Sequence, residues 1–214
     1  MDDYQTPIDR IALREFSADD QEIMCRIWGD SRVAKHTAFD TMSADQVAAT
    51  LEQAAADARK VPRETYTLAV SDAISGEAIG SVSLVLGPEE SGYGRWLTIK
   101  PSLWSSGIGR AAVALFLELA FRDLSLHRVW CVTTLNNPTA GASLEAAGFT
   151  RDGVIRDFCR KGGEWCTVHH YSILNYEWRK SFRDRGNRLE LATLSRPRES
   201  NPEGTEGKQG EKCP

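Results

Sequence analysis

Along the first part of the chain, apolar residues pass from the alternation of a strand to the period of a helix. Residues 11–13 alternate with their neighbours, whereas residues 23–28 place apolar side chains at helical intervals. A second helical stretch begins at Ser43, which can form a capping box with Gln46 and precedes an apolar stripe through residues 47–58. One strand followed by two helices is therefore predicted here.

The middle of the chain returns to alternation. Apolar and polar side chains alternate over residues 66–70 and 82–86, and residues 72–76 between them have the composition of a turn. A further strand is predicted over residues 96–99, ending at Pro101. These segments predict antiparallel strands joined in a meander.

A helix between two strands follows. Past Gly107, the apolar residues of 113–124 fall at helical spacing, and residues 129–132 form a short β-prone run. Because one strand precedes this helix and another follows it, the two strands are predicted to be parallel neighbours.

The last folded part is predicted to hold one helix and two strands. Asn137 can cap a helix with Pro138 at its first position, and Gly148 can end it about three turns later. Strands are predicted over residues 153–159 and 165–176. The complete pattern predicts an α/β (α+β) fold with a mixed, mostly antiparallel sheet of about seven strands flanked by helices.

Length and composition separate a domain from a tail. The 214 residues are 41% hydrophobic and 26% charged, which suits one globular domain, assigned to residues 1–178. Residues 179–214 are rich in Pro, Gly, Glu, Lys and Ser with few apolar residues, so we expect a disordered tail whose first third could form a basic helical extension.

The charge is uneven along the chain. The formal net charge is −4, and the tail holds nine basic and six acidic residues, which leaves residues 1–178 near −7. An acidic domain argues against a nucleic-acid partner, because such a surface needs a basic stripe, and it mildly favours a cationic acceptor.

No targeting or metal-binding pattern stands out. The first ten residues lack the layout of a secretory signal, and no uncharged apolar run is long enough to cross a bilayer, so a cytoplasmic protein without a membrane partner is expected. The five cysteines are odd in number and spread out, without CxxC spacing: Cys25, Cys131, Cys159, Cys166 and Cys213. We expect reduced thiols and no metal site.

Residues 97–110 place a strand, a turn with two glycines and a helix start in immediate succession. Backbone N–H groups at a helix start lack internal partners, so such a turn can bind a diphosphate, and Gly107 and Gly109 remove side chains that would block close approach. A plain turn before a helix is the simpler alternative. A dinucleotide site would need an acidic residue near the end of the next strand, but residues 132–135 hold none.

The segment L-x-I-x-P-x-x-W-x-x-G-x-G resembles the coenzyme A (CoA) signature of GNAT acetyltransferases, which reads L-x-V-x-P followed by R/Q-x-x-G-x-G/A. Residues 126–129 (LHRV), Asn137, residues 144–149 (LEAAGF) and residues 162–165 (GGEW) also resemble family motifs in the same order. The resemblance covers roughly residues 9–176 and is nearest to the ribosomal-protein N-terminal acetyltransferase (Rim-type) branch.

The resemblance implies acetyl-CoA as cosubstrate, bound where a central pair of strands splays apart near Val129. The backbone groups that it places along the pantetheine arm are those of Leu97, Thr98 and Ile99. The amides that it places around the pyrophosphate are those of Ser105, Ser106, Gly107, Ile108, Gly109 and Arg110. It also places the side chain of Asn137 near the pantetheine or thioester, a role compatible with helix capping.

The sequence departs from the family pattern in two places. Trp104 stands where the superfamily has Arg or Gln, a common change in this branch, and Ser105 and Ser106 replace the usual Gly and basic residue. Ala140 and Leu144 stand where relatives carry a Ser and the Tyr that serves as general acid. Water or Ser143 could supply that proton instead.

Few residues are candidates for proton transfer. The candidate catalytic residues are Asn137, Glu90 and Ser143, and further candidate bases are Glu89, His169 and His170. An α-amine with a pKa near 8 needs little help to lose its proton, so a site poor in bases favours such an amine. The aromatic residues that could line the acceptor side are Trp28, His36, Phe39 and Trp165.

The expected activity is therefore direct transfer of acetyl from acetyl-CoA to a primary amine. The acceptor would be a protein N-terminal α-amine or a small amine such as an antibiotic or metabolite, and the enzyme a monomer or homodimer. Two alternatives are a catalytically silent acyl-CoA-binding module and an O-acetyltransferase.

Overall fold

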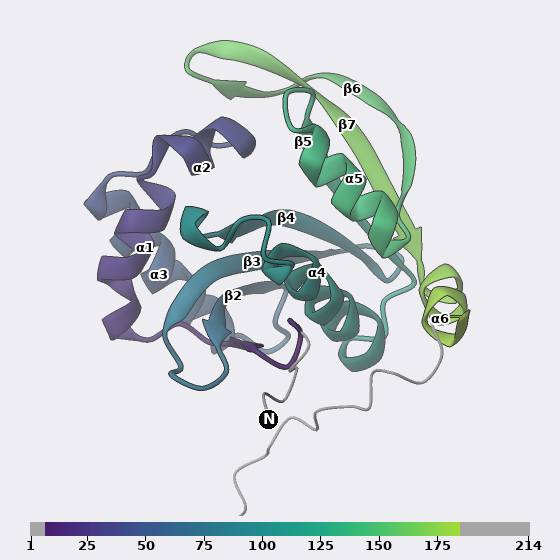
Figure 1. The fold of residues 1–214 in the computed structure, drawn as a ribbon, viewed down its shortest axis with the longest axis horizontal. Helices are drawn as coiled ribbons and strands as arrows, with labels where there is room; N and C mark the ends of the chain where they lie inside the picture. The colour runs from purple at the N-terminus through teal and green to yellow at the C-terminus, as the bar shows by residue number, and fades with distance from the viewer. Residues whose placement is uncertain (1–6, 185–214) are drawn as a thin grey trace, which may run out of the picture.

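A seven-stranded sheet runs through the computed structural model, which describes residues 7–184 (Figure 1). The strands are β1 (Ile11–Arg14), β2 (Thr65–Asp72), β3 (Ala78–Gly87), β4 (Ser91–Ile99), β5 (Arg128–Thr134), β6 (Thr150–Lys161) and β7 (Glu164–Leu174). Their order in the sheet is β1-β2-β3-β4-β5-β7-β6, and β4–β5 is its parallel pair. The predicted mixed, mostly antiparallel sheet is confirmed.

The helices form two groups that cover the sheet. They are α1 (Gln21–Trp28), α2 (Ser31–His36), α3 (Ala44–Ala58), α4 (Ile108–Glu118), α5 (Pro138–Ala147) and α6 (Asn175–Asp184). Short helical turns at Ala18–Asp20, Pro101–Leu103 and Leu119–Asp123 adjoin them. The largest apolar cluster joins α4 to one face of the sheet, and a second one joins α1 and α3 to the opposite face of β2 and β3.

Local signals in the sequence begin and end several helices as predicted. Ser43 caps α3, and the reciprocal bond between Gln46 and the Ser43 backbone completes the capping box. Asn137 caps α5, whose end is marked by Gly148 with a left-handed φ of 102°. Helix α2 was not predicted, because its six residues are too few to show a period.

The central strands β4 and β5 separate partway along their length, and we call this opening the fork. They pair from Ser91 to Gly94 and from Arg128 to Cys131. A Cβ at Gly94 would lie 3.1 Å from Phe116 Cζ and 3.4 Å from Cys131 Cβ, so glycine allows α4 to pack closely where the strands part. The predicted splayed pair is present, with its open end towards Ile99 and Thr134.

The β6–β7 hairpin reaches back to α2 (Figure 1). Gly162 and Gly163 both have positive φ, as a tight two-residue hairpin turn requires. Lys161 Nζ donates to the carbonyl oxygens of Ala34 and Thr37, and Gly162 N donates to Asp40 Oδ2 at 3.0 Å. The same hairpin pairs Cys159 with Cys166 across its two strands. These two thiols are seven residues apart in the sequence and were expected to be spread out.

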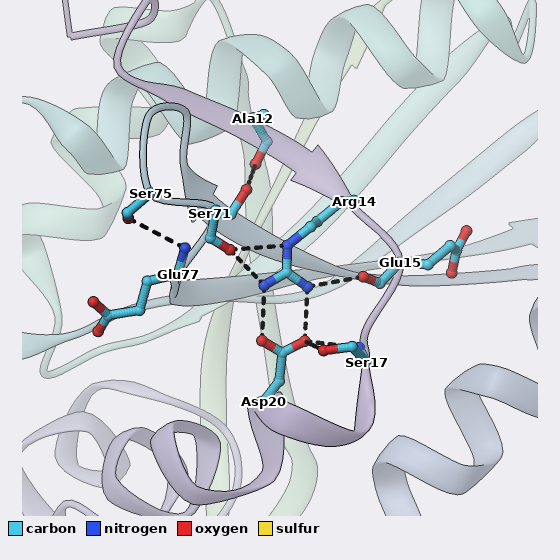
Figure 2. A network of polar contacts seen from close by, with 9 residues as sticks. Ala12, Arg14, Glu15, Ser17, Asp20, Ser71, Ser75 and Glu77 are labelled. Atoms are coloured by element: carbon cyan, nitrogen blue, oxygen red, sulfur yellow. Dashed lines mark hydrogen bonds and ion pairs between the residues drawn. The ribbon is translucent and has the colours of Figure 1, made fainter. Parts of the chain in front are cut away.

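A partly buried ion pair joins β1 to the start of the first helix (Figure 2). Arg14 donates from both Nη atoms to Asp20 at 2.7 Å and from Nη2 to the Gly76 carbonyl at 2.7 Å. The Asp20 side chain is 6% exposed, and hydrogen bonds from Arg14 lower its pKa. The pair therefore ties β1, the first helix and the β2–β3 turn together.

The end of the fold differs from the predicted one. Strand β7 ends at Leu174, two residues before the predicted Tyr176, because the Leu174 N–H bonds to Glu177 Oε2 at 2.9 Å and α6 begins. The predicted domain end at residue 178 falls within α6, and residues 185–214 lie outside the described residues.

Over residues 7–184, no helix is both long enough and apolar enough to cross a membrane.

Candidate active site

The turn before α4 presents unpaired backbone donors. Ser105 and Gly107 have left-handed φ values of 63° and 87°, and Gly107 stands at the N-cap of α4. The N–H groups of Gly107, Gly109 and Arg110 have no acceptor among residues 7–184. Three free donors at the start of a helix favour an anion there.

The same turn leaves room for a ligand. A Cβ added at Gly109 would meet no described atom within 4 Å, whereas one at Gly107 would lie 3.3 Å from Pro7 Cγ. The side chain of Ser106 bonds to the Leu103 carbonyl at 2.6 Å and so stabilises the turn itself. Open space beside Gly109, next to the free donors, fits a diphosphate.

At Thr98 on the β4 edge of the fork, the side-chain hydroxyl already has partners, whereas main-chain groups of this edge can still bind a ligand. Thr98 is buried, and its hydroxyl bonds to Ser81 Oγ at 2.7 Å and accepts from Trp28 Nε1 at 3.3 Å. The Trp104 indole donates to the Ile99 carbonyl at 2.8 Å, which uses one lone pair of that oxygen. A ligand along this edge would therefore bond to main-chain groups.

Five buried polar atoms near the open end of the fork have no hydrogen-bond partner among the described residues. They are Trp96 Nε1 on β4, Thr133 Oγ1 and Thr134 Oγ1 on β5, His169 Nδ1 on β7, and His36 Nδ1 on α2. Folded proteins satisfy most buried polar atoms, so a group of unsatisfied ones is typical of a binding site. Trp96 and the two threonines belong to no sequence motif, so they were not predicted as site residues.

Asn137 lies at the end of the fork and connects two elements. Its Oδ1 accepts from Ala140 N at 3.1 Å, and its Nδ2 donates to the His36 carbonyl at 2.9 Å. The His36 ring in turn meets the Trp104 indole edge to face, with 5.6 Å between centroids. The side chain thus caps α5 and holds the end of α2 against the predicted cofactor turn.

The other predicted catalytic residues lie away from this turn. Glu89 and Glu90 precede β4 at the paired end of the fork, where the Glu90 carbonyl accepts from His127 N at 2.8 Å. About 16 Å of extended strand separates Glu90 from the fork at Arg95. Ser143 is half-buried on α5 and donates to the Thr139 carbonyl of its own helix at 2.8 Å.

The two candidate histidines point to opposite faces of β7, because neighbouring strand residues alternate. His169 pairs in register with Thr133 at the open end of the fork. His170 stacks on Trp130, with 5.3 Å between centroids, and contacts Asp152 Oδ2 at 3.1 Å.

The aromatic candidates for the acceptor side differ in position. Trp28 is fully buried and belongs to the core, whereas Phe39 meets Trp96 edge to face with 6.0 Å between centroids. Trp165 is 56% exposed on the β6–β7 hairpin. Leu144, at the position of the missing general acid, packs against the main core.

Known proteins resemble this chain over most of its length. Residues 10–150 match the family model described as acetyltransferase (GNAT) domain. The chain is 25% identical over 170 residues to the uncharacterized N-acetyltransferase YnaD of Bacillus subtilis (strain 168), covering 79% of this chain and 96% of that protein. It is 22% identical over 172 residues to the uncharacterized N-acetyltransferase p20 of Bacillus licheniformis, covering 79% and 96%.

Solved structures share the fold. The spermidine N-acetyltransferase from Vibrio cholerae, solved in complex with CoA and spermine, superposes with a TM-score of 0.69 at 20% identity, covering 79% of this chain and 98% of that one. A GNAT-family acetyltransferase from Bacillus anthracis superposes with a TM-score of 0.67 at 18% identity, covering 78% and 96%.

Proposed function

The chain belongs to the GNAT family of acetyltransferases, and from this premise we propose that it acetylates a primary amine of low pKa, above all an N-terminal α-amine. The family membership makes it an acetyl-CoA-dependent N-acetyltransferase. The proposal concerns the acceptor and the residues that serve the transfer.

The observation that carries the proposal is the set of free N–H donors at the start of α4, beside the open end of the fork. Gly107, Gly109 and Arg110 would hold the diphosphate of CoA, and the backbone from Leu97 to Ile99 would align its pantetheine arm. Acetyl-CoA supplies an acetyl group activated as a thioester.

The protein's contribution is mainly positioning. Strands β4 and β5 would hold the thioester at a fixed place between them, and Asn137 would keep α2 and α5 in register around it. Main-chain donors at the fork could stabilise negative charge on the thioester oxygen without any reorganisation.

The shortage of bases bears on the acceptor. Glu90 lies at the paired end of the fork and Ser143 is bonded within its own helix, so of the candidate bases His169, in register with Thr133, lies at the open end. An α-amine, with a pKa of about 7.7–8.0, is partly neutral near pH 7, whereas a lysine amine with a pKa of about 10.4 needs a base. The resemblance to the ribosomal-protein branch supports the same class of acceptor.

Thiol release from acetyl-CoA tests the proposal, with a panel of peptides and small amines and mass spectrometry of each product. We expect release with α-amine acceptors and a product that resists hydroxylamine, as an amide does and an ester does not. Tight CoA binding with no release for any acceptor would refute transfer and support a silent binding module. A hydroxylamine-sensitive product would indicate O-acetylation.

A further inference from the structure

Arg95 occupies a β-bulge at the point where the fork opens. The β3–β4 register passes from Leu84 opposite Gly94 to Ser83 opposite Trp96, so Arg95 is the extra residue. The pairing of β4 with β5 also ends at Gly94. A bulge redirects a side chain and is frequent beside active sites.

The guanidinium of Arg95 lies on the face of the sheet that α2 approaches. Its Cζ is 4.6 Å from the centre of the Trp96 ring, and Phe39, which follows α2, meets the same ring. Burial raises the pKa of Tyr93, and the positive charge of Arg95 opposes that rise, which places the guanidinium near Tyr93 as well.

Arg95 is exposed and has no carboxylate partner among residues 7–184. Six other arginines in this part of the chain form ion pairs, namely Arg14, Arg26, Arg32, Arg63, Arg122 and Arg128. A guanidinium that stacks on an aromatic ring is held in place while its N–H groups stay available to an anion.

The segments around Arg95 carry a small positive net charge, although the domain is acidic. Residues 30–40 and 156–164 contact each other through Lys161 and Gly162. Together they hold five Lys or Arg and four Asp or Glu, a net charge of +1, and Arg95 raises it to +2. Residues 1–178 as a whole carry about −7. The mild preference for a cationic acceptor, drawn from the whole domain, does not hold for this region.

We propose that Arg95 selects acceptors whose amine carries a carboxylate within a few bonds, such as an amino acid or the N-terminus of an acidic peptide. This inference rests on the proposed amine acetylation. Arginine can bind a carboxylate through two parallel hydrogen bonds, which would orient the amine towards the fork. A polyamine brings several positive charges to the same place and is repelled.

The test compares acceptors that differ only in charge. Peptides beginning Ser-Glu, Ser-Gln and Ser-Lys, free glutamate and spermidine are assayed with the parent, Arg95→Ala, Arg95→Glu and the control Arg59→Ala. Arg59 is exposed at the end of α3 and has no ion pair among the described residues. The two carboxylate sources, peptide and free amino acid, form separate arms.

We expect the parent to favour the Ser-Glu peptide or free glutamate over spermidine. Arg95→Ala should raise KM for the carboxylate acceptors about tenfold, as expected for loss of a hydrogen-bonded charge pair, and leave the Ser-Gln peptide within about twofold. Arg95→Glu should shift the preference to the Ser-Lys peptide, and Arg59→Ala should change nothing.

Three outcomes would overturn the inference. If the parent acetylates spermidine or the Ser-Lys peptide as well as the acidic acceptors, acetylation stands and Arg95 is not the selector. The same conclusion follows if Arg95→Ala slows every acceptor equally. Absence of transfer to every acceptor would refute the proposed function together with this inference.

Discussion

Substitution of Gly109 by glutamate should move stability and cofactor binding in opposite directions. Gly109 is the second residue of α4, and an added side chain meets no described atom within 4 Å at its Cβ. Replacing glycine in a helix gains about 0.5–1 kcal/mol, and an acidic residue in the first turn gains about 0.3–1 kcal/mol. The protein without ligand should therefore unfold about 2–8 °C higher.

The same carboxylate should weaken CoA binding. At about 6 Å from a diphosphate with two negative charges, its repulsion is about 1.4 kcal/mol at the dielectric constant of water and about 5.5 kcal/mol at an effective value of 20. The dissociation constant should rise at least about tenfold, and less in 1 M salt, where the charges are screened.

Thermal unfolding without ligand and titration calorimetry with CoA measure the two effects. Gly109→Gln is the matched control, because it has the same size and no charge, and Gly109→Ala reports the effect of the Cβ alone. The reasoning fails if Gly109→Glu destabilises the free protein, or if its CoA affinity stays within about twofold of that of Gly109→Gln.

Three further substitutions test other parts of the structure. Asp20→Ala breaks the pair with Arg14 and should lower the free energy of unfolding by about 3 kcal/mol at pH 7. Because the pKa of Asp20 is lowered in the folded state, its contribution to stability is complete above about pH 3.9 and is lost as the pH falls further. In urea unfolding, the stabilities of the parent and Asp20→Ala should therefore converge towards pH 2. A difference that stays constant with pH would contradict this. Asn137→Ala should lower the free energy of unfolding by about 1–2 kcal/mol in the same assay, because α5 loses its cap and the His36 carbonyl loses its donor. Asn137→Asp should keep the cap and lose less stability. Equal losses in the two variants would argue against capping. Glu90→Gln should leave kcat/KM within about twofold, and a loss of a hundredfold would show that Glu90 reaches the acceptor after all.

Elements with local signals were predictable from the sequence. The caps at Ser43 and Asn137 and the glycine that ends α5 act within a few residues, so sequence spacing alone reveals them. The turn that we propose binds the cofactor could be located for the same reason, because strand, glycines and helix are contiguous between residues 97 and 110.

Features that depend on distant partners were not predictable. The end of α2 depends on Lys161, more than 120 residues away, which donates to the carbonyls of Ala34 in α2 and of Thr37 just after it. The bulge at Arg95 exists only relative to β3, and no periodicity reveals it. Which end of β4 faces the site depends on where its pairing with β5 stops, at Gly94, so the sequence could not show that Glu90 lies at the paired end.

The structure of the protein crystallised with acetyl-CoA tests the central claim most directly. We expect diphosphate oxygens within hydrogen-bonding distance of the N–H groups of Gly107, Gly109 and Arg110, and a pantetheine arm along Leu97–Ile99 that carries the thioester into the fork. A diphosphate bound elsewhere, or a thioester outside the gap between β4 and β5, would contradict it.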